Sequence, residues 1–249
     1  MDTQWYLDVN RFARQTAWAH SFMHFYALYG GVLLLALLVV VAFWRARGGF
    51  GFGGSAGQVA AVLWTAGGTL LALGLNQPLT HLVGRPRPYA VLHGVEVLVP
   101  RANDFTLPSD HATAAGAIVV GLWLSRDRLV AGLATLLGLF LAFARVYVGA
   151  HYPGDVLAGL GFGALVVLAG YPVAAPLLRR GVEIVGRSPL GILVGIVHGE
   201  RPAGPGPAAQ PTTLGATGSV RILDGDGPQP RVRAGSSSDV DSGRGMAGS

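Results

Sequence analysis

Apolar residues along this chain gather in long uninterrupted runs instead of alternating with polar ones. Residues 22–44 and 156–178 each form a run of 23 without a formal charge, and residues 59–75 form a run of 17. Two shorter runs, 112–124 and 129–144, hold 13 and 16 residues. A helix that crosses a bilayer needs about 20 apolar residues, with a range of roughly 17–25. Three runs reach that length directly, and the two shorter ones reach it when their polar ends are included.

This pattern predicts an all-α fold, a polytopic membrane helical bundle of about five spans. The alternative, in which the two shorter runs form a buried hairpin of a soluble core, leaves the three long runs without an explanation. Ahead of the first run, Trp5, Val9 and Phe12 recur at helical spacing between charged residues. That spacing is typical of an amphipathic helix lying in the membrane interface, with a frayed N-terminus as the alternative.

The runs divide the chain into three regions. Residues 1–21 form the predicted N-terminal interfacial segment, and residues 22–180 form the predicted membrane domain. Residues 181–249 are predicted to form a mostly disordered tail. From Glu200 onward the chain is dominated by Gly, Pro, Ala and Ser with scattered charges, and it lacks any periodicity.

The composition narrows the class of protein further. Hydrophobic residues make up 51% of the chain and charged residues only 12%, about half the usual quarter for soluble domains. There is no cysteine and no lysine, which excludes disulfides, thiolate metal sites, Schiff bases on lysine and the P-loop lysine. The net charge of +5 lies entirely before residue 200, where arginines flank apolar runs. We therefore predict the lipid bilayer as a partner, and no nucleic acid.

Arginines also predict the orientation in the membrane. The loop after the first run, the loop after the third and the end of the fifth carry Arg45 and Arg47, Arg126 and Arg128, and Arg179 and Arg180. With five spans, these segments share one side of the membrane, which the positive-inside rule makes cytoplasmic. We therefore predict a multi-pass plasma-membrane protein with a cytoplasmic tail, in which the loop 76–110 and the turn 145–155 face outside.

Ionisable residues at membrane depth are costly and usually functional, and three segments concentrate them. In the first, residues 80–89, Pro86 and Pro88 favour an extended backbone and direct Arg85 and Arg87 in different directions. Guanidinium groups bind phosphate oxygens bidentately. The alternative is that both arginines contact lipid headgroups.

The second segment, residues 107–113, opens the third apolar run. Ser109 stands at the N-cap position, so free main-chain N–H groups there predict an anion site at a helix N-terminus. His111 lies in the first turn, beside that anion. Simple capping, with His111 as an interfacial residue, is the alternative.

The third segment, residues 144–155, holds a histidine and a carboxylate four residues apart. His151 and Asp155 can share one face of a helical turn, and a carboxylate bound to one ring nitrogen leaves the other as nucleophile or base. Arg145 can reach the same place. A zinc site built from histidines and Asp155 is the competing chemistry, but several arginines in one pocket favour a phosphate over a cation, so we predict no metal.

In order along the chain, the three segments resemble the signature motifs of the type 2 phosphatidic acid phosphatase superfamily, which is shared with vanadium haloperoxidases. The family pattern is Lys-x6-Arg-Pro, then Pro-Ser-Gly-His, then Ser-Arg-x5-His-x3-Asp. It is matched here by Arg87-Pro88, by Pro108-Ser109-x-His111 and by Arg145-x5-His151-x3-Asp155. The resemblance covers roughly residues 1–180. The Gly-Arg-Pro-Arg-Pro and Pro-Ser-Asp-His-Ala forms resemble the bacterial undecaprenyl-diphosphate phosphatase branch.

The chain departs from the family pattern at three positions. Thr80 stands at the lysine position, Asp110 replaces glycine and Ala144 replaces serine. The lysine is one of the cations that hold phosphate in the family, so Arg85 or His81 is expected to compensate. A non-catalytic lipid-binding homologue is the alternative that this departure leaves open.

The resemblance implies a lipid phosphatase that uses neither metal nor other cofactor. His151 attacks phosphorus to form a phosphohistidine, Asp155 orients His151, and His111 protonates the leaving oxygen and then activates water. The implied phosphate-binding residues are Arg87, Arg145, Ser109, Asp110, Arg85 and Thr80. The implied lipid phosphate substrate is undecaprenyl diphosphate or a related polyprenyl diphosphate, with phosphatidic acid or phosphatidylglycerophosphate as alternatives.

Overall fold

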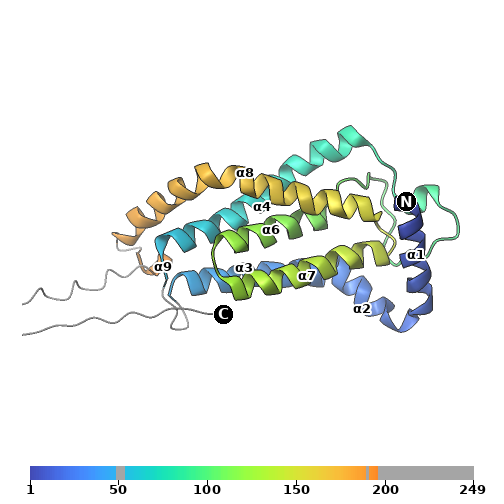
Figure 1. Ribbon diagram of the computed structural model, residues 1–249, viewed down its shortest axis with the longest axis horizontal. Coiled ribbons are helices and arrows are strands. Elements are labelled where there is room, and N and C mark those ends of the chain that lie inside the picture. Colours follow the sequence, from blue (N-terminus) through green and yellow to red (C-terminus); the bar gives the residue numbers. More distant parts are fainter. Residues whose placement is uncertain (49–53, 189–190, 196–249) are drawn as a thin grey trace, which may run out of the picture. The chain divides into compact units, whose positions relative to one another are not determined.

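Four helical stretches of the computed structural model are long and apolar enough to cross a bilayer. They cover Ala17–Ala46, Ala56–Val83, Arg128–Tyr147 and Pro153–Gly186, and a shorter apolar helix covers Asp110–Leu124. The structure describes residues 1–48, 54–188 and 191–195, and this part of the chain holds no β-strand. The predicted all-α membrane bundle is confirmed (Figure 1).

The helices follow one another in a simple order. They are α1 (Asp2–Gln15), the 3-10 turn η1 (Ala17–Ala19), α2 (His20–Phe25), the π-helical turn η2 (Tyr26–Gly30), α3 (Gly31–Ala46), α4 (Ala56–Val83), α5 (Pro88–Val91), α6 (Asp110–Leu124), α7 (Arg128–Tyr147), α8 (Pro153–Gly186) and α9 (Gly191–Val194). The segment predicted as the tail therefore begins inside α8. Most of that tail, residues 196–249, lies outside the described part of the chain, so its predicted disorder stays a prediction.

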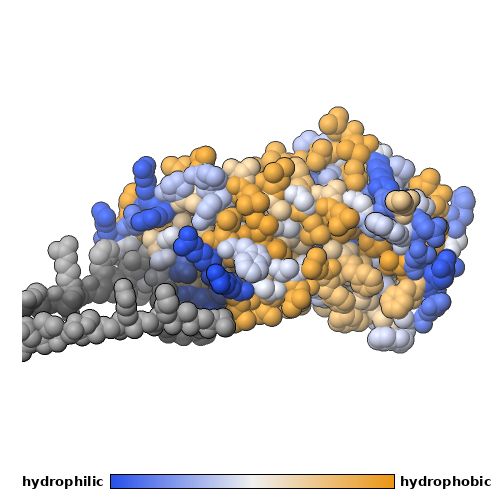
Figure 2. Space-filling model, viewed as in Figure 1, coloured by the Kyte–Doolittle hydropathy of each residue, from blue (hydrophilic) through white to orange (hydrophobic). Residues whose placement is uncertain are grey.

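Surface hydropathy agrees with a bundle embedded in lipid. Large apolar side chains point outward from several helices, with Leu70, Leu136 and Leu165 between 63% and 72% exposed. Figure 2 shows hydrophobic residues over the middle of the bundle and hydrophilic ones toward its two ends. Because water would penalise so much exposed apolar surface, the outer face of the bundle fits a hydrocarbon environment.

Helix α4 is longer than the apolar run that predicted it. The run ends at Leu75, and the segment from residue 76 was expected to be an outward loop. Instead the helix continues to Val83, with Pro78 inside it, and ends at Gly84 in the left-handed conformation (φ 61°). Polar residues in these last turns are compatible with a helix, since the Thr80 hydroxyl donates to the Asn76 carbonyl at 2.8 Å. Thr80 therefore lies on a helix, and the expectation of a loop here is wrong.

The short helix α6 lies at the centre of the bundle. It packs against α4, α7 and α8, and nine of its fifteen residues are buried. Fifteen residues span only about 22 Å at 1.5 Å per residue, less than the hydrocarbon thickness of about 30 Å. A helix surrounded by longer helices does not meet lipid along its length, so α6 needs no lipid-spanning length of its own.

Glycines bring the backbones of α6 and α8 into direct contact. A Cβ atom added at Gly163 would lie 2.0 Å from the Thr113 carbonyl oxygen, and one added at Gly116 would lie 2.1 Å from the Leu160 carbonyl oxygen. Small residues allow this close approach of membrane helices. The contacts place the first turn of α6 against α8 at Gly159 and Gly163.

Helix α1 covers the end of the bundle at which α6 and α8 begin (Figure 1). Its buried face is formed by Tyr6, Asn10 and Ala13. The Asn10 side chain donates to the Glu96 carbonyl at 2.8 Å and accepts from the Glu96 N–H at 3.0 Å. Trp5 and Phe12, from the predicted apolar stripe, are about half exposed. The Phe12 ring lies edge-on against that of Tyr147 on α7, with 6.1 Å between the ring centres, so this side of α1 packs partly on the bundle.

Candidate active site

A cavity of about 220 Å³ lies at the end of the bundle that carries α1. It is lined by residues from the end of α4, the loop before α6, the first turn of α6, the end of α7 and the turn before α8. The lining side chains are Gln77, Thr80, His81, Arg87, Asp104, Phe105, Pro108, Asp110, His111, Arg145 and His151. The fold thus brings together the three segments singled out in the sequence, which lie up to 75 positions apart.

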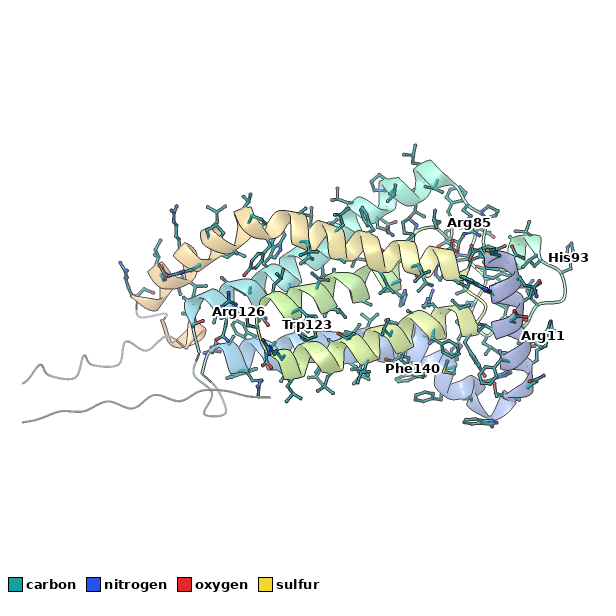
Figure 3. The ribbon with its side chains drawn as sticks, in the orientation of Figure 1. Arg11, Arg85, His93, Trp123, Arg126 and Phe140 are labelled. Atoms are coloured by element: carbon teal, nitrogen blue, oxygen red, sulfur yellow. The ribbon has the colours of Figure 1, made fainter. Side chains whose placement is uncertain are left out.

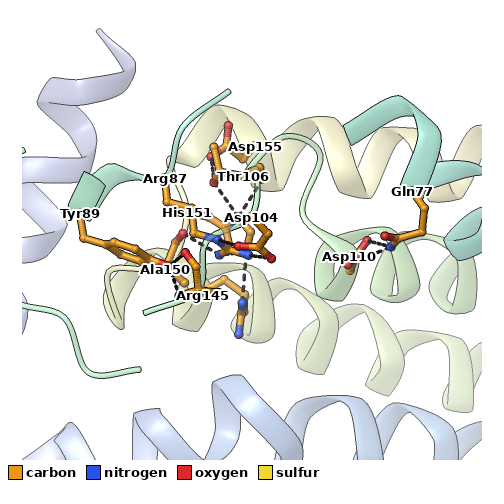
Figure 4. A network of polar contacts seen from close by, with 11 residues as sticks. Gln77, Arg87, Tyr89, Asp104, Thr106, Asp110, Arg145, Ala150, His151 and Asp155 are labelled. Carbon is orange, nitrogen blue, oxygen red and sulfur yellow. Dashed lines mark hydrogen bonds and ion pairs between the residues drawn. The ribbon is translucent and has the colours of Figure 1, made fainter. Parts of the chain in front are cut away.

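The ring of His151 is buried and its two nitrogens face different partners (Figure 4). Nε2 lies 3.1 Å from Nη2 of Arg145 and 3.5 Å from Nη1 of Arg87. Nδ1 lies 3.0 Å from the main-chain oxygen of Thr106. Guanidinium groups are donors only, so Nε2 accepts and the ring proton sits on Nδ1. The unprotonated nitrogen is therefore the one that faces the cavity and the arginines.

Burial, together with the charges of Arg145 and Arg87, lowers the pKa of His151 well below its usual 6.5. Desolvation penalises the charged imidazolium, and the two guanidinium groups repel it. His151 is consequently neutral at physiological pH. A neutral ring with a free lone pair at Nε2 is the form in which histidine acts as a nucleophile.

Asp155 is connected to His151 through the side chain of Thr106. Its Oδ2 accepts from the Thr106 hydroxyl at 2.6 Å and from the Tyr152 N–H at 2.9 Å. The Thr106 hydroxyl oxygen lies 3.0 Å from Nδ1 of His151. The spacing suggested a direct hydrogen bond between the Asp155 carboxylate and the His151 ring. Among the described residues, the structure has no such hydrogen bond. The reason is that His151 precedes the N-cap of α8, whereas the carboxylate of Asp155 folds back to cap the helix at Tyr152.

Arg85 and Arg87 point in different directions, as the two prolines predict. Arg85 does not belong to the described lining of the cavity. Its Nη1 donates to Oδ1 of Asp155 at 2.6 Å and its Nη2 to Asp2 at 2.7 Å, and its guanidinium lies 4.1 Å from the centre of the Tyr152 ring. The structure therefore places Arg85 on the carboxylate of Asp155, on the side away from the cavity.

Arg87 lines the cavity and is shared among three groups. Its Nε and Nη2 form a bidentate pair with Asp104, at 2.5 and 2.8 Å, while Nη1 donates to the Ala150 carbonyl at 3.2 Å and faces His151. Hydrogen bonding to Arg87 lowers the pKa of Asp104 below its usual range. This pair occupies the fork with which an arginine binds a phosphate.

The π-helical turn η2 anchors two more site residues. Nη1 of Arg145 donates to the Ala27 carbonyl at 3.1 Å, and Nε2 of His111 lies 3.3 Å from the Leu28 carbonyl. A π-helical turn inside an α-helix is rare and is frequent at functional sites. Here, main-chain oxygens of the first span orient an arginine and a histidine of the cavity.

The remaining predicted phosphate-binding residues surround the first turn of α6. Ser109 is the N-cap residue and is fully buried; within the described chain its hydroxyl has no hydrogen-bond partner. The carboxylate of Asp110 accepts from Asn76 at 2.6 Å and from Gln77 at 3.2 Å. Thr80 lines the cavity from α4. These contacts join the start of α6 to the end of α4.

Sequence reasoning missed Thr106, Asp104 and Gln77. Thr106 stands one residue before the segment singled out at Leu107, and its hydroxyl beside that segment was the available signal. Asp104 and Gln77 lie in no motif, so local pattern gave no indication of them. In the described part of the chain, no three His, Asp or Glu side chains come together as a metal site would require.

Residues 61–178 match the family model of the PAP2 superfamily. The chain is 37% identical over 120 residues to Undecaprenyl-diphosphatase BcrC of Bacillus subtilis (strain 168), which covers 47% of this chain and 60% of that protein. It is 29% identical over 90 residues to an undecaprenyl-diphosphatase of Sulfolobus acidocaldarius, covering 36% of this chain and 44% of that protein. A lipid A 1-phosphatase of Rhizobium johnstonii is 38% identical over 91 residues, covering 34% of this chain and 36% of that protein. The chain thus spans 60% or less of the length of these curated relatives.

Proposed function

Residues 61–178 of this chain are a PAP2 superfamily domain, and from this premise we propose that the protein is an integral membrane lipid phosphatase that hydrolyses a polyprenyl diphosphate, such as undecaprenyl diphosphate. One observation carries the proposal. The unprotonated Nε2 of buried His151 faces a cavity and lies within 3.5 Å of the guanidinium groups of Arg145 and Arg87. A nucleophile between two phosphate-binding cations is the arrangement that phosphoryl transfer needs.

In the first half of the proposed reaction, Nε2 of His151 attacks the terminal phosphorus. The bond between Nε2 and phosphorus forms while the bond from phosphorus to the leaving oxygen breaks. His111, in the first turn of α6, gives a proton to that oxygen. The lipid product leaves, and the phosphoryl group remains on the enzyme as a phosphohistidine.

In the second half, His111 takes a proton from water and the resulting hydroxide attacks the phosphohistidine. The nitrogen–phosphorus bond breaks, inorganic phosphate is released and Nε2 of His151 is free again. Asp155 acts throughout by holding the ring with its proton on Nδ1. One histidine thus acts first as acid and then as base, which restores the starting protonation state after each turnover.

Arg87, Arg145, the Ser109 hydroxyl and the main-chain N–H groups at Asp110 bind the phosphate oxygens in this proposal. Arg87, Arg145 and Asp110 line the cavity before substrate arrives, so charge that develops on the transferring group meets preorganised donors. Arg87 exchanges the carboxylate of Asp104 for phosphate when substrate binds. Because the arginines supply the positive charge, the reaction proceeds without a metal ion.

Two relatives that are named undecaprenyl-diphosphatases support the proposed substrate class. A lipid phosphate monoester such as phosphatidic acid is the second candidate, favoured by the similarity to a lipid A 1-phosphatase. The cavity lies at one end of the bundle with Arg85, His93 and Arg11, whereas Arg126 lies at the other (Figure 3). We place the cavity at the outer face of the plasma membrane and the arginine-rich end, with the tail, in the cytoplasm.

Phosphate release from purified protein in detergent tests the function. Undecaprenyl diphosphate, undecaprenyl phosphate, phosphatidic acid and phosphatidylglycerophosphate are compared in the presence of excess chelator. We expect the diphosphate to be hydrolysed fastest and chelator to have no effect. Phosphate release that stops in chelator and returns with zinc or magnesium would contradict the metal-free mechanism, and release from the monoesters alone would contradict the diphosphate assignment.

The nucleophile is tested with His151→Ala, which removes the ring that forms the covalent bond. Turnover should fall by more than a thousandfold, and substrate labelled in its terminal phosphate should no longer leave an acid-labile, alkali-stable label on the protein. His93→Ala is the matched control, because His93 is exposed and lies outside the described lining of the cavity. A tenth or more of wild-type turnover in His151→Ala would rule out a phosphohistidine.

A further inference from the structure

Thr106 occupies an unusual position between the reactive histidine and its carboxylate. It is fully buried, although it is not among the described residues that line the cavity. Its hydroxyl oxygen lies 3.0 Å from Nδ1 of His151 and 2.6 Å from Oδ2 of Asp155, as Figure 4 shows. A side chain in this place touches both members of the pair without touching the space for phosphate.

The directions of these hydrogen bonds follow from the other partners. Among the described residues, the hydrogen-bond partners of Nε2 of His151 are guanidinium donors on Arg145 and Arg87, so the ring proton is on Nδ1. Asp155 is paired with Arg85 at 2.6 Å, which favours its ionised, acceptor-only form. The single hydroxyl proton of Thr106 is therefore donated in the hydrogen bond to Asp155. The Nδ1–H of His151 is shared between two acceptors at 3.0 Å, the hydroxyl oxygen and the main-chain oxygen of Thr106.

We propose that the hydroxyl of Thr106 is a positioning group that connects Asp155 to His151, so that the unit supporting the nucleophile is a histidine–threonine–aspartate chain. The proposal rests on the proposed function. When Nε2 bonds to phosphorus, positive charge develops on the ring, and the Nδ1–H bond to Thr106 strengthens. The ring proton stays on Nδ1, because the hydroxyl group of Thr106 already donates its hydrogen bond to the carboxylate of Asp155.

The hydrogen-bond partners of Asp155 explain how its carboxylate can act on His151 without contacting the ring. Its two oxygens accept from Thr106, from the Tyr152 N–H and from Arg85. These three donors hold the carboxylate in one orientation, fully buried. Its charge can therefore polarise the hydroxyl in a fixed direction, and the hydroxyl in turn fixes the ring.

Thr106→Val tests the proposal because it keeps the shape of the side chain and removes the hydroxyl. We expect kcat to fall by about tenfold to a hundredfold, the range for a hydrogen bond to a charged group, with KM within about twofold because the phosphate contacts remain. Thr106→Ser restores the hydroxyl and should return kcat to within about threefold of wild type. The matched control is Thr65→Val. Like Thr106, Thr65 is fully buried. Its hydroxyl donates to the Ala61 main-chain oxygen at 2.9 Å. Because Thr65 lies outside the site, Thr65→Val should leave kcat unchanged.

Proton and nitrogen NMR of protein labelled with 15N-histidine gives a second readout that needs no substrate. The His151 signal is identified by its loss in His151→Gln. We expect the wild-type proton on Nδ1, and an upfield shift of that proton in Thr106→Val but not in Thr65→Val, because one acceptor is lost. This readout stands even if no lipid phosphate is hydrolysed, so failure of the proposed function and failure of this inference are distinguishable.

Three results would overturn the inference. They are a wild-type ring protonated on Nε2, a kcat of Thr106→Val within twofold of wild type, and a folded Thr106→Ser variant as slow as Thr106→Val. If Thr106→Val does not insert into the membrane, two results still overturn the inference: a wild-type ring protonated on Nε2, and a folded Thr106→Ser variant whose kcat is lower than that of wild type by about tenfold or more.

Discussion

Two arginines separated by one proline have different roles in this site. Arg87 lines the cavity beside His151, whereas Arg85 holds Asp155 and Asp2. The family lysine is absent at Thr80, and Arg85 or His81 is the expected substitute as a phosphate ligand; His81 lines the cavity, and Arg85 does not. The position of Arg85 favours instead a role in holding the carboxylate, and this distinction can be measured.

Arg85→Gln should lower kcat by about tenfold to a hundredfold, because a buried carboxylate loses its charged partner. Thr80→Lys should not repair this loss, since a lysine at position 80 enters the cavity and does not reach the place of Arg85 on Asp155. A double-mutant cycle on kcat/KM should give effects that add within roughly 0.3–0.5 kcal/mol. Arg101→Gln, an exposed position in the segment between α5 and α6, is the control. Recovery of activity in the double variant would show that the two cations serve one phosphate.

The lowered pKa of His151 predicts the pH dependence of the reaction. Attack requires the neutral ring, and burial with the charges of Arg145 and Arg87 holds the pKa well below 6.5. As pH falls, protonation of this ring removes the nucleophile, so the acid limb that His151 contributes to kcat/KM should lie below pH 6.5. Arg87→Gln removes one repelling cation and should move that limb to higher pH, whatever its effect on the maximal rate. A limb that stays in place or moves to lower pH would contradict this electrostatic account.

At the scale of elements, the site depends on how closely two helices approach. Ser109 and His111 begin α6, and Asp155 lies in the first turn of α8. The backbones of these helices touch at Gly163, where an added Cβ would lie 2.0 Å from a carbonyl oxygen. The geometry of the proposed site therefore depends on glycines that take no part in the proposed reaction.

Gly163→Ala should force α8 away from α6 and cost about 1–3 kcal/mol, as overpacking usually does. Activity should fall together with the melting temperature in detergent, because displacement of a catalytic group by about 1 Å can cost a hundredfold in rate. Gly161→Ala on the same helix is the matched control, since no atom lies within 4 Å of its added Cβ. That variant should be neutral or more stable, by up to about 1 kcal/mol of helix propensity. Equal melting temperatures for the two variants would argue against close packing of α6 on α8.

At the scale of the whole molecule, the two ends of the bundle carry different polar groups. One end holds the cavity, and the other holds Arg45 and the loop with Arg126 and Arg128, where Arg45 pairs with Asp127 at 2.5 Å. The positive-inside rule predicts that the arginine-rich end is cytoplasmic. The proposed topology therefore places the opening of the cavity on the outer face.

Single cysteines test this orientation, because the chain has none of its own. Arg101→Cys and Arg128→Cys both replace exposed residues, one at each end of the bundle. In intact cells, a membrane-impermeant thiol reagent should label position 101, and it should label position 128 only after the membrane is permeabilised. The reverse pattern would invert the topology.

The sequence by itself determined the helical membrane class, the approximate spans and the three segments that meet at the cavity. Runs of apolar residues and closely spaced motifs are local properties of the sequence, so they can be recognised without knowledge of the fold. Even the divergence of Arg85 and Arg87 follows from the prolines between and after them.

Only the tertiary structure decided which groups touch. It placed Thr106 between His151 and Asp155, put Arg85 on that carboxylate, and brought the Ala27 carbonyl to Arg145. These contacts join residues 45 to 118 positions apart, and they depend on how closely helices pack and on where each helix begins and ends. The extension of α4 beyond its apolar run and the burial of the short helix α6 have the same cause. Packing against neighbouring helices, which no local pattern records, decides both.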